Sequence, residues 1–282
     1  MAHQITGIDH VLLAVRDLDE ACRTFSRLGF TASPRGGHKE WGTANHCLMF
    51  PRDYIELIGV AGTGPGAARV AAHLDGRGDS LLGVALGSRN ASSSYHSLRR
   101  AGVPVTAPAA LSRSLMAPDG EVTPRFAVVD MAKDTLPGLP SFLCQHLTPE
   151  LLRRPEWLDH ANGATGIISL TVLVDHPEAL MADYNRIFGP AASTPTDEMV
   201  TVHSGGSLVF LVTAGGFDDL HPALDLKLPE PPAVVALTIG VNDMSLTAAR
   251  LRANGIKADS KGGHLAVSPA DALGIGLEFV ER

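Results

Sequence analysis

Residue types suited to acid–base chemistry stand at the two ends of one stretch of the chain, from Gly7 to Val60. His10 lies in an apolar run near its start, and Glu56 lies in a second apolar run near its end. An imidazole exchanges its proton near neutral pH, and a neighbouring carboxylate can orient it as a general base or acid. Both groups are also common ligands of divalent metal ions. This stretch is therefore the first candidate for a chemically active centre.

The segment GGHKEWGTANHC, from Gly36 to Cys47, concentrates polar and aromatic side chains between these two runs. His38 is a candidate second acid or base, Trp41 offers a flat surface to a ligand, and Asn45 offers both a donor and an acceptor. Alternatively, Trp41 only caps the core and Asn45 only satisfies loop amides. The glycines before His38 and after Trp41 favour a shaped loop over a strand.

The elements that must hold these residues follow the order β, α, β, β, β. Ile8–Val15 has the apolar pattern of a strand, and Asp17 after it can cap the free amides at the start of a helix. That helix shows one apolar face at three- and four-residue spacing and ends at Gly29. Three further strands are expected near Phe30–Ser33, His46–Phe50 and Tyr54–Val60.

The same order of elements returns three more times along the chain. The positions that match His10 in the later units are Gly83, Ser169 and Ala236. The glycine that ends each helix follows these four positions by 19, 19, 20 and 19 residues. One such unit cannot bury both faces of its sheet, so the units should pair. We therefore predict an α+β fold in which four βαβββ modules form two open, curled, mixed β-sheet barrels with helices outside.

This pairing divides the chain into two barrels. Residues 1–147 form the first barrel from modules 7–60 and 81–147, residues 148–165 are a connector, and residues 166–282 form the second barrel from modules 166–215 and 233–282. The matching positions of the second barrel hold Ser169, Ala236, Phe210 and Glu278. One carboxylate cannot hold a catalytic ion, so we interpret this barrel as degenerate, with a structural role or a contribution to dimerisation or pocket closure, and Glu278 as solvated or paired.

Composition excludes several classes of partner. A net charge of −7 without a basic cluster argues against nucleic acid. The longest apolar run, Ala233–Val241, has nine residues, whereas a membrane span needs about 20. No secretory signal is seen, and the three cysteines have the pattern of buried free thiols, so we expect a cytoplasmic protein. A small molecule is the expected partner, and a homodimer is an open option.

The opening IDHVLLAV, the helix end Leu28-Gly29-Phe30 and the closing Tyr54-Ile55-Glu56-Leu57, set in four βαβββ units, resemble the vicinal oxygen chelate superfamily. This superfamily includes glyoxalase I, extradiol dioxygenases, fosfomycin-resistance enzymes and bleomycin-binding proteins. The segment GGHKEWGTANHC followed by YIELIGV is similar to bacterial glyoxalase-like domain proteins. The resemblance implies paired modules that curl around a ligand pocket.

The resemblance also implies that His10 and Glu56 would bind one divalent ion, such as Zn, Fe, Mn or Ni. The second unit departs from the pattern, because Gly83 replaces the histidine and we align Gln145 with the glutamate. A catalytic ion usually has three protein ligands, so the third ligand is open and the site could also work without metal. Three histidines outside the pattern are candidates for it, namely His38, His46 and His146.

Our leading hypothesis is an enzyme of the lyase or isomerase type that acts on a small oxygenated metabolite by proton transfer or metal-assisted enolate stabilisation. In it, His10, Glu56 and His38 are catalytic. Four residues are expected to contact the substrate, namely Trp41, Asn45, Arg125 and Gln145. The runner-up is a binding protein of the bleomycin-sequestering type, and an extradiol-type dioxygenase is third.

Two further interpretations carry an alternative. Arg125 could pair with an anionic substrate at the barrel mouth or with a surface carboxylate. The run GTGPG, Gly62–Gly66, lacks the lysine of a phosphate loop and no helix is expected after it, so we interpret it as a linker.

Overall fold

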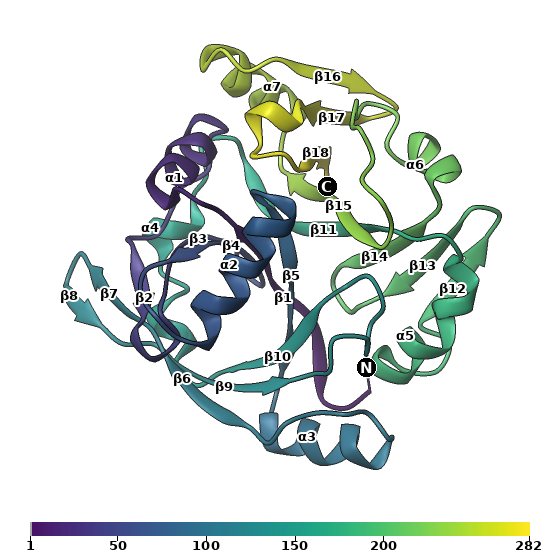
Figure 1. Cartoon of the computed structure of the whole chain (residues 1–282). Coiled ribbons are helices and arrows are strands. Elements are labelled where there is room, and N and C mark those ends of the chain that lie inside the picture. Colours follow the sequence, from purple (N-terminus) through teal and green to yellow (C-terminus); the bar gives the residue numbers. More distant parts are fainter. Residues whose placement is uncertain (1) are drawn as a thin grey trace.

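The computed structural model describes residues 2–282 and contains two curled, mixed β-sheets (Figure 1), which confirms the predicted α+β fold class. The first sheet has the strand order β6-β9-β10-β5-β1-β4-β3-β2-β7-β8. Its strands are β1 Ile5–Ala14, β2 Gly36–His38, β3 Thr43–Met49, β4 Tyr54–Val60, β5 Ser80–Ser88, β6 Ala109–Ser112, β7 Ser114–Ala117, β8 Gly120–Val122, β9 Arg125–Asp130 and β10 Ser141–His146.

The second sheet has the order β12-β13-β14-β11-β15-β18-β17-β16 and lies beside the first (Figure 1). Its strands are β11 Ala164–Leu173, β12 Ser193–Thr196, β13 Met199–His203, β14 Leu208–Val212, β15 Ala233–Val241, β16 Ala258–Lys261, β17 His264–Val267 and β18 Gly276–Glu281. In both sheets a long central strand pairs in parallel with one neighbour and antiparallel with the other: β1 between β4 and β5, and β11 between β14 and β15.

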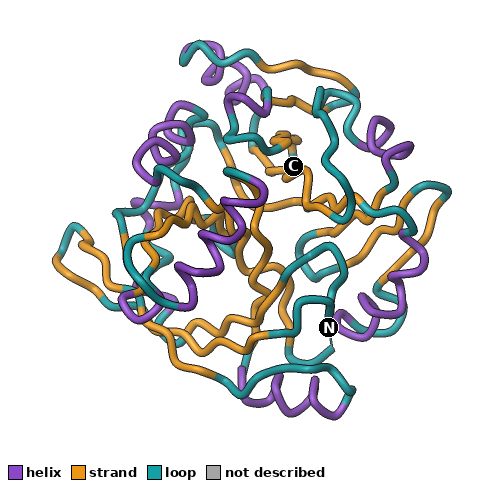
Figure 2. Tube along the Cα trace, viewed as in Figure 1, coloured by secondary structure: helices purple, strands orange, loops and turns teal. Residues whose placement is uncertain are grey.

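Helices connect the strands and cover both sheets (Figure 2). They are α1 Leu18–Arg27, α2 Pro65–Arg77, α3 Ala91–Arg100, α4 Pro155–Leu158, α5 Met181–Phe188, α6 Ala214–Leu220 and α7 Met244–Ala253, with short 3-10 turns η1 Lys39–Trp41, η2 Pro149–Leu151, η3 Pro177–Leu180 and η4 Pro269–Asp271. None of the helices described is long and apolar enough to cross a membrane. As predicted, Asp17 caps α1 by accepting a hydrogen bond from the Glu20 amide.

Three local predictions were wrong. The expected strand near Phe30–Ser33 is irregular chain, and the segment expected to be a loop contains β2, which pairs with β3 and β7. A helix, α2, begins at Pro65 inside the GTGPG run that was interpreted as a linker. Proline is favourable at the first position of a helix because its missing N–H would have no partner there. The apolar residues Val70 and Leu74 of α2 pack on the first sheet.

Alternation along β1 gives the first sheet two different faces. Val11 and Leu13 belong to the large core that both sheets share, in which Phe30 stacks on Phe279 of β18 at 6.0 Å. His10 and Leu12 point to the opposite face, which α2 covers. Helix α2 therefore lies on the face that carries the predicted centre.

A β-bulge interrupts this alternation at the start of the centre. Ile8 lies opposite Leu86 of β5 and His10 lies opposite Ala85, so Asp9 is the extra residue of β1. A bulge re-aims a side chain that regular alternation would send to the other face. The register breaks three times in β1, and each break recurs in β11, two units and 159 residues later in the chain.

Asp53, in the turn between β3 and β4, joins the two sheets. It is buried, and its Oδ1 accepts a hydrogen bond from the Ile167 amide of β11 at 2.9 Å. Burial raises the pKa of Asp53 to about 6 from its usual 3.8, although the Ile167 amide opposes the shift. The folded chain therefore binds this proton more tightly than the unfolded chain, and stability should fall as the pH rises from about 4 to about 6.

Asp53→Asn should remove this pH dependence, because asparagine keeps an oxygen acceptor for Ile167 and does not ionise. We expect the variant to be more stable than the wild type above pH 6, by up to about 3 kcal/mol, and the difference to vanish below pH 4. Urea unfolding at several pH values measures it, with the exposed Asp75→Asn as control. An unchanged pH slope in Asp53→Asn would contradict the assignment.

Candidate functional site

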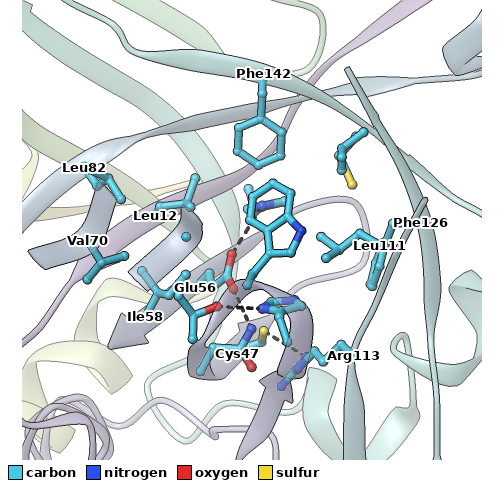
Figure 3. A pocket seen from close by; sticks show the side chains of 18 of the residues that line it. Leu12, Cys47, Glu56, Ile58, Val70, Leu82, Leu111, Arg113, Phe126 and Phe142 are labelled. Carbon is cyan, nitrogen blue, oxygen red and sulfur yellow. Dashed lines mark hydrogen bonds and ion pairs between the residues drawn. The ribbon is translucent and has the colours of Figure 1, made fainter. Parts of the chain in front are cut away.

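A cavity of about 70 Å³ lies between the first sheet and α2, and His10 and Glu56 both line it. Its walls are mainly apolar, with Leu12, Val70 and Leu82 on one side and Leu111 and Phe126 on the other (Figure 3). This volume accommodates several water molecules or a small organic group. The predicted residues His38, Trp41 and Asn45 line the same cavity.

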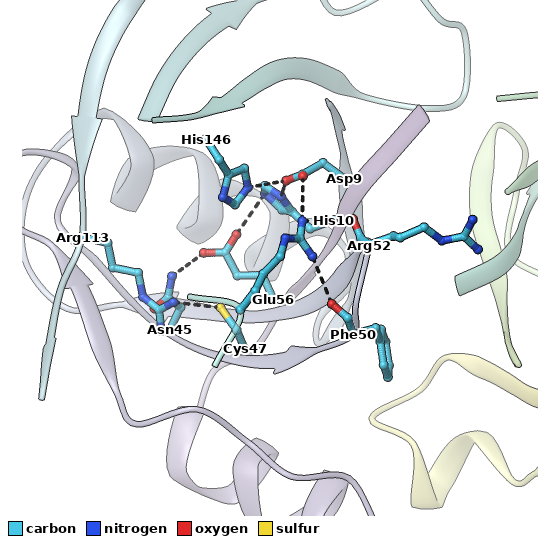
Figure 4. Close-up of polar contacts among 10 residues, drawn as sticks. Asp9, His10, Asn45, Cys47, Phe50, Arg52, Glu56, Arg113 and His146 are labelled. Carbon is cyan, nitrogen blue, oxygen red and sulfur yellow. Dashed lines mark hydrogen bonds and ion pairs between the residues drawn. The ribbon is translucent and has the colours of Figure 1, made fainter. Parts of the chain in front are cut away.

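His10 lies between two carboxylates (Figure 4). Its Nδ1 is 2.8 Å from Asp9 Oδ2, and its Nε2 is 3.4 Å from Glu56 Oε2. The ring stacks on Tyr54 at 4.3 Å, which fixes its plane. Because a carboxylate only accepts hydrogen bonds, Nδ1 carries a proton, and Nε2 is the atom that can exchange one with Glu56 or a ligand.

Asp9 is the residue that organises this network. The alternation of residues along β1 did not predict that its side chain would lie beside His10. Its Oδ2 also accepts a hydrogen bond from His146 Nε2 at 2.9 Å, and Arg153 Nη2 lies 3.7 Å from its Oδ1. Burial by itself would raise the pKa of Asp9, but the hydrogen bonds from His10 and His146 outweigh it and hold the pKa well below its usual range. Asp9 is therefore a fixed negative charge behind His10.

Three of the sequence-predicted residues complete the cavity wall around Glu56. Asn45 Nδ2 donates to Glu56 Oε1 at 2.5 Å, while Asn45 Oδ1 is buried without a partner among residues 2–282. His38 Nδ1 is 3.1 Å from Thr43 Oγ1, and burial lowers its pKa, with Glu56 partly opposing this. His38 is thus held as a neutral imidazole. Trp41, half-buried on η1, packs against the start of α2.

The strand register corrects one step of the repeat alignment. Glu56 lies opposite the residue that stands two positions after His10, and Phe142 lies opposite the residue two positions after Gly83. Phe142, and not Gln145, therefore occupies the place of the glutamate in the second unit. Its ring packs edge-on against His10 at 5.8 Å.

The structure does not bring Gln145 and Arg125 to the cavity. Gln145 points to the other side of β10, where its Oε1 accepts a hydrogen bond from the Ala91 amide at the start of α3. Arg125 is exposed at the start of β9. We expected Gln145 to face inward and the next residue, His146, to face away. The two side chains alternate the other way round, so His146 faces inward and reaches Asp9.

The ligand geometry tests the implied metal site. The distance of 3.4 Å between His10 Nε2 and Glu56 Oε2 suits two ligands about 2.1 Å from one tetrahedral ion. However, Gly83 and Phe142 offer no ligand, and within residues 2–282 no third histidine, cysteine or carboxylate joins the pair in a compact group. His46 hydrogen-bonds Ser33 O instead. The pair does not form a three-ligand metal centre.

A different group of potential ligands lies beside it. Asp9, Cys144 and His146 each place one such atom within 4.8 Å of the others. Burial raises the pKa of the Cys144 thiol, and the charges of Asp9 and Glu56 raise it further, so the thiolate that a metal requires is disfavoured in this arrangement. Asp9 Oδ2 is already bonded to both His10 and His146.

The second sheet contains a related cluster that the sequence only partly revealed. Glu278 is 0% exposed, and its Oε2 is 2.6 Å from His221 Nδ1 and 3.1 Å from His264 Nδ1. His221 Nε2 is in turn 2.7 Å from Thr171 Oγ1. Glu278 was predicted to be solvated or paired, and it is paired. The segment after α6, which carries His221, packs through Leu224 on the face of the second sheet that bears Leu173 and Ala236.

The connector residues have structural roles. His160 is buried, accepts a hydrogen bond from the Thr31 amide at Nδ1 and donates from Nε2 to Met49 O. Asn162 Nδ2 donates to Leu28 O. These contacts join the connector to the first unit, away from the cavity.

Comparisons with known proteins agree with this architecture. The glyoxalase-like domain family matches residues 8–188, and none of the curated proteins matches the chain. A hypothetical protein from Staphylococcus aureus shares the fold with a TM-score of 0.67 at 9% identity, over 98% of this chain and 99% of that one.

Two further structures share the fold at low identity. A mutant of 4-hydroxymandelate synthase from Streptomyces coelicolor has a TM-score of 0.56 at 18% identity, over 99% of this chain and 93% of that one. A fusion of a xylose isomerase-like TIM barrel with a 4-hydroxyphenylpyruvate dioxygenase has a TM-score of 0.58 at 14% identity, and this chain spans 49% of it. Because the family match covers well over half of the sequence, the chain belongs to the glyoxalase-like domain family of the vicinal oxygen chelate superfamily.

Proposed function

We propose that this glyoxalase-like protein is an enzyme of the lyase or isomerase type that moves a proton at a carbon next to a carbonyl group of a small oxygenated metabolite. The observation that carries the proposal is the placement of His10, buried in the cavity wall between the carboxylates of Asp9 and Glu56. A histidine held in this way has one nitrogen fixed and the other available to the cavity.

The roles follow from the contacts. Asp9 accepts a hydrogen bond from the Nδ1–H of His10 and so directs the Nε2 of His10 towards Glu56 and the cavity. The Nε2 and Oε2 atoms together take a proton from the substrate carbon, whose electron pair moves to the carbonyl oxygen to give an enolate. The His10 and Glu56 pair, or the neutral His38, then donates a proton to the neighbouring atom of the enolate. Trp41 and Asn45 supply stacking and hydrogen-bonding surface beside it.

Hydrogen–deuterium exchange into the substrate tests this function directly. We expect that the protein, in heavy water with a panel of small 2-oxo and 2-hydroxycarbonyl compounds, incorporates deuterium next to the carbonyl of at least one of them, as measured by NMR. The alternative of a binding protein would be supported if no compound of the panel gained deuterium after long incubation and at least one of them bound tightly.

The same assay separates acid–base catalysis from the metal-assisted form, for which the cluster of Asp9, Cys144 and His146 is the candidate ligand group. A divalent ion there would polarise a substrate oxygen. We expect the exchange to survive chelation, with protein purified without a histidine tag. Loss of exchange on chelation, restored by Zn, Fe, Mn or Ni, would contradict the metal-free mechanism.

A further inference from the structure

Arg113, in the chain between β6 and β7, is a buried cation without a carboxylate partner. Its side chain is 2% exposed and lines the cavity beside Glu56 (Figure 3). Among residues 2–282, no carboxylate oxygen lies within 4.0 Å of its guanidinium nitrogens. A charge removed from water is strongly destabilising unless a counter-charge compensates for it.

The contacts that Arg113 does make are with neutral acceptors. Its Nη1 donates to Cys47 Sγ at 3.1 Å, and its Nη2 donates to Ser33 Oγ at 3.2 Å and to Pro34 O at 3.4 Å. Burial raises the pKa of Cys47 to about 12, so its sulfur is a thiol and not a counter-ion. The Nε–H has no acceptor among the residues described. Among the residues described, the guanidinium therefore has no direct ion pair and its Nε–H is a free donor.

The backbone beside Arg113 is shaped to admit the guanidinium. A Cβ added at Gly36 of β2 would lie 2.1 Å from Nε and 2.8 Å from Cζ, so a glycine is required here. A second arginine, Arg69 of α2, also lines the cavity, and among residues 2–282 no carboxylate oxygen lies within 4.0 Å of it, although it feels the charge of Asp130. The start of α2 at Gly66, which carries the positive end of the helix dipole, also faces the cavity.

The carboxylate of Glu56 is already committed to other partners. One of its oxygens accepts from Asn45 and the other faces His10. The cavity thus divides into an acid–base part around His10 and a cationic part around Arg113. Apolar side chains, among them Leu111 and Phe126, form the wall next to the cationic part (Figure 3).

We propose that Arg113 binds a carboxylate group of the substrate, which is then a small monocarboxylate with an apolar body. A planar carboxylate matches the planar fork of donors that a guanidinium presents, and it fits a small apolar cavity. The turnover of such a molecule rests on the proposed function of His10 and Glu56. The binding of its carboxylate does not.

Matched pairs of ligands that differ only in charge test the inference. Isobutyrate and phenylacetate are compared with isobutyramide and phenylacetamide by calorimetry on the full chain. We expect at least one carboxylate to bind about tenfold or more tightly than its amide, and this preference to disappear in Arg113→Met. Gly36→Ala should also abolish it although Arg113 is still present, because the new Cβ displaces the guanidinium. Arg100→Met, on the exposed face of α3, is the control and should keep the preference.

Thermal melting distinguishes a ligand-binding arginine from a structural one. Removal of a buried charge that has no direct ion pair should raise the melting temperature of the free Arg113→Met variant. If Arg113 only holds the segment of Ser33 and Pro34 in place, the variant should melt at a lower temperature and the ratio of carboxylate to amide affinity should not change. That result, or equal affinities for acid and amide in the wild type, would overturn the inference.

The outcomes for the two proposals are separable. Carboxylate preference in a protein that exchanges no substrate proton supports the assignment of Arg113 and contradicts the enzymatic function. Proton exchange on neutral carbonyl compounds without any carboxylate preference supports the enzymatic function and contradicts the assignment of Arg113.

Discussion

Replacement of His10 by glutamine should reduce kcat/KM for proton exchange by about 10² to 10⁴-fold, the range typical of a lost general acid or base. Glutamine can still donate towards Asp9 but cannot carry a proton to and from the substrate. Most of the loss should be in kcat, because the apolar walls that bind the substrate are unchanged. Deuterium incorporation followed by NMR measures the effect.

The matched variants sharpen this result. Glu56→Gln keeps the shape of the side chain and an acceptor for Asn45, so a comparable loss of exchange would assign the proton transfer to the His10 and Glu56 pair. His96→Gln changes an exposed histidine of α3 and should leave the rate unaltered. Near wild-type exchange in His10→Gln would exclude His10 from the chemistry.

Replacement of Glu278 by alanine should destabilise the folded chain by about 3–5 kcal/mol, the range for removal of one partner from a buried polar network. Glu278 is 0% exposed and accepts from the buried His221 and from the partly buried His264. The substitution leaves both donors without this acceptor. Urea unfolding at constant pH measures the change in free energy.

Two comparisons separate this network from a general effect of charge. Glu278→Gln preserves an oxygen acceptor and should cost clearly less than the alanine variant. Glu230→Ala removes an exposed carboxylate and should change stability by less than about 0.5 kcal/mol. A loss of under 1 kcal/mol in Glu278→Ala would show that the cluster contributes little to folding. Proton exchange well below the melting temperature should be unaffected if the second sheet is structural.

Local sequence patterns were sufficient to predict the architecture and to name several residues that line the cavity of the candidate site. The constant spacing from His10, Gly83, Ser169 and Ala236 to a helix-ending glycine reports four copies of one unit, because the turn geometry at each glycine limits what can replace it. The strand register then places His10 and Glu56 as the repeat predicted. Both line one cavity with His38, Trp41 and Asn45.

The missing parts of the site depend on contacts between distant segments. Asp9 reaches His10 only through the bulge in β1, which sets two residues of one strand against one of the next. Arg113 comes from the second unit and contacts Cys47 of the first. Helix α2 was the exception, since Pro65 followed by Val70 and Leu74 gave a local signal of a helix start and an apolar face.

The matching irregularities of β1 and β11 bear on how the chain evolved. All three breaks in register recur at equivalent places, although the side chains there differ, with Asp9 in one strand and Ile168 in the other. The two halves therefore share one backbone pattern with its bulge, which is the pattern that duplication of a two-module unit leaves. Because the bulge is present with either side chain, exchanging a carboxylate and an apolar group at this position requires a substitution and no change of backbone.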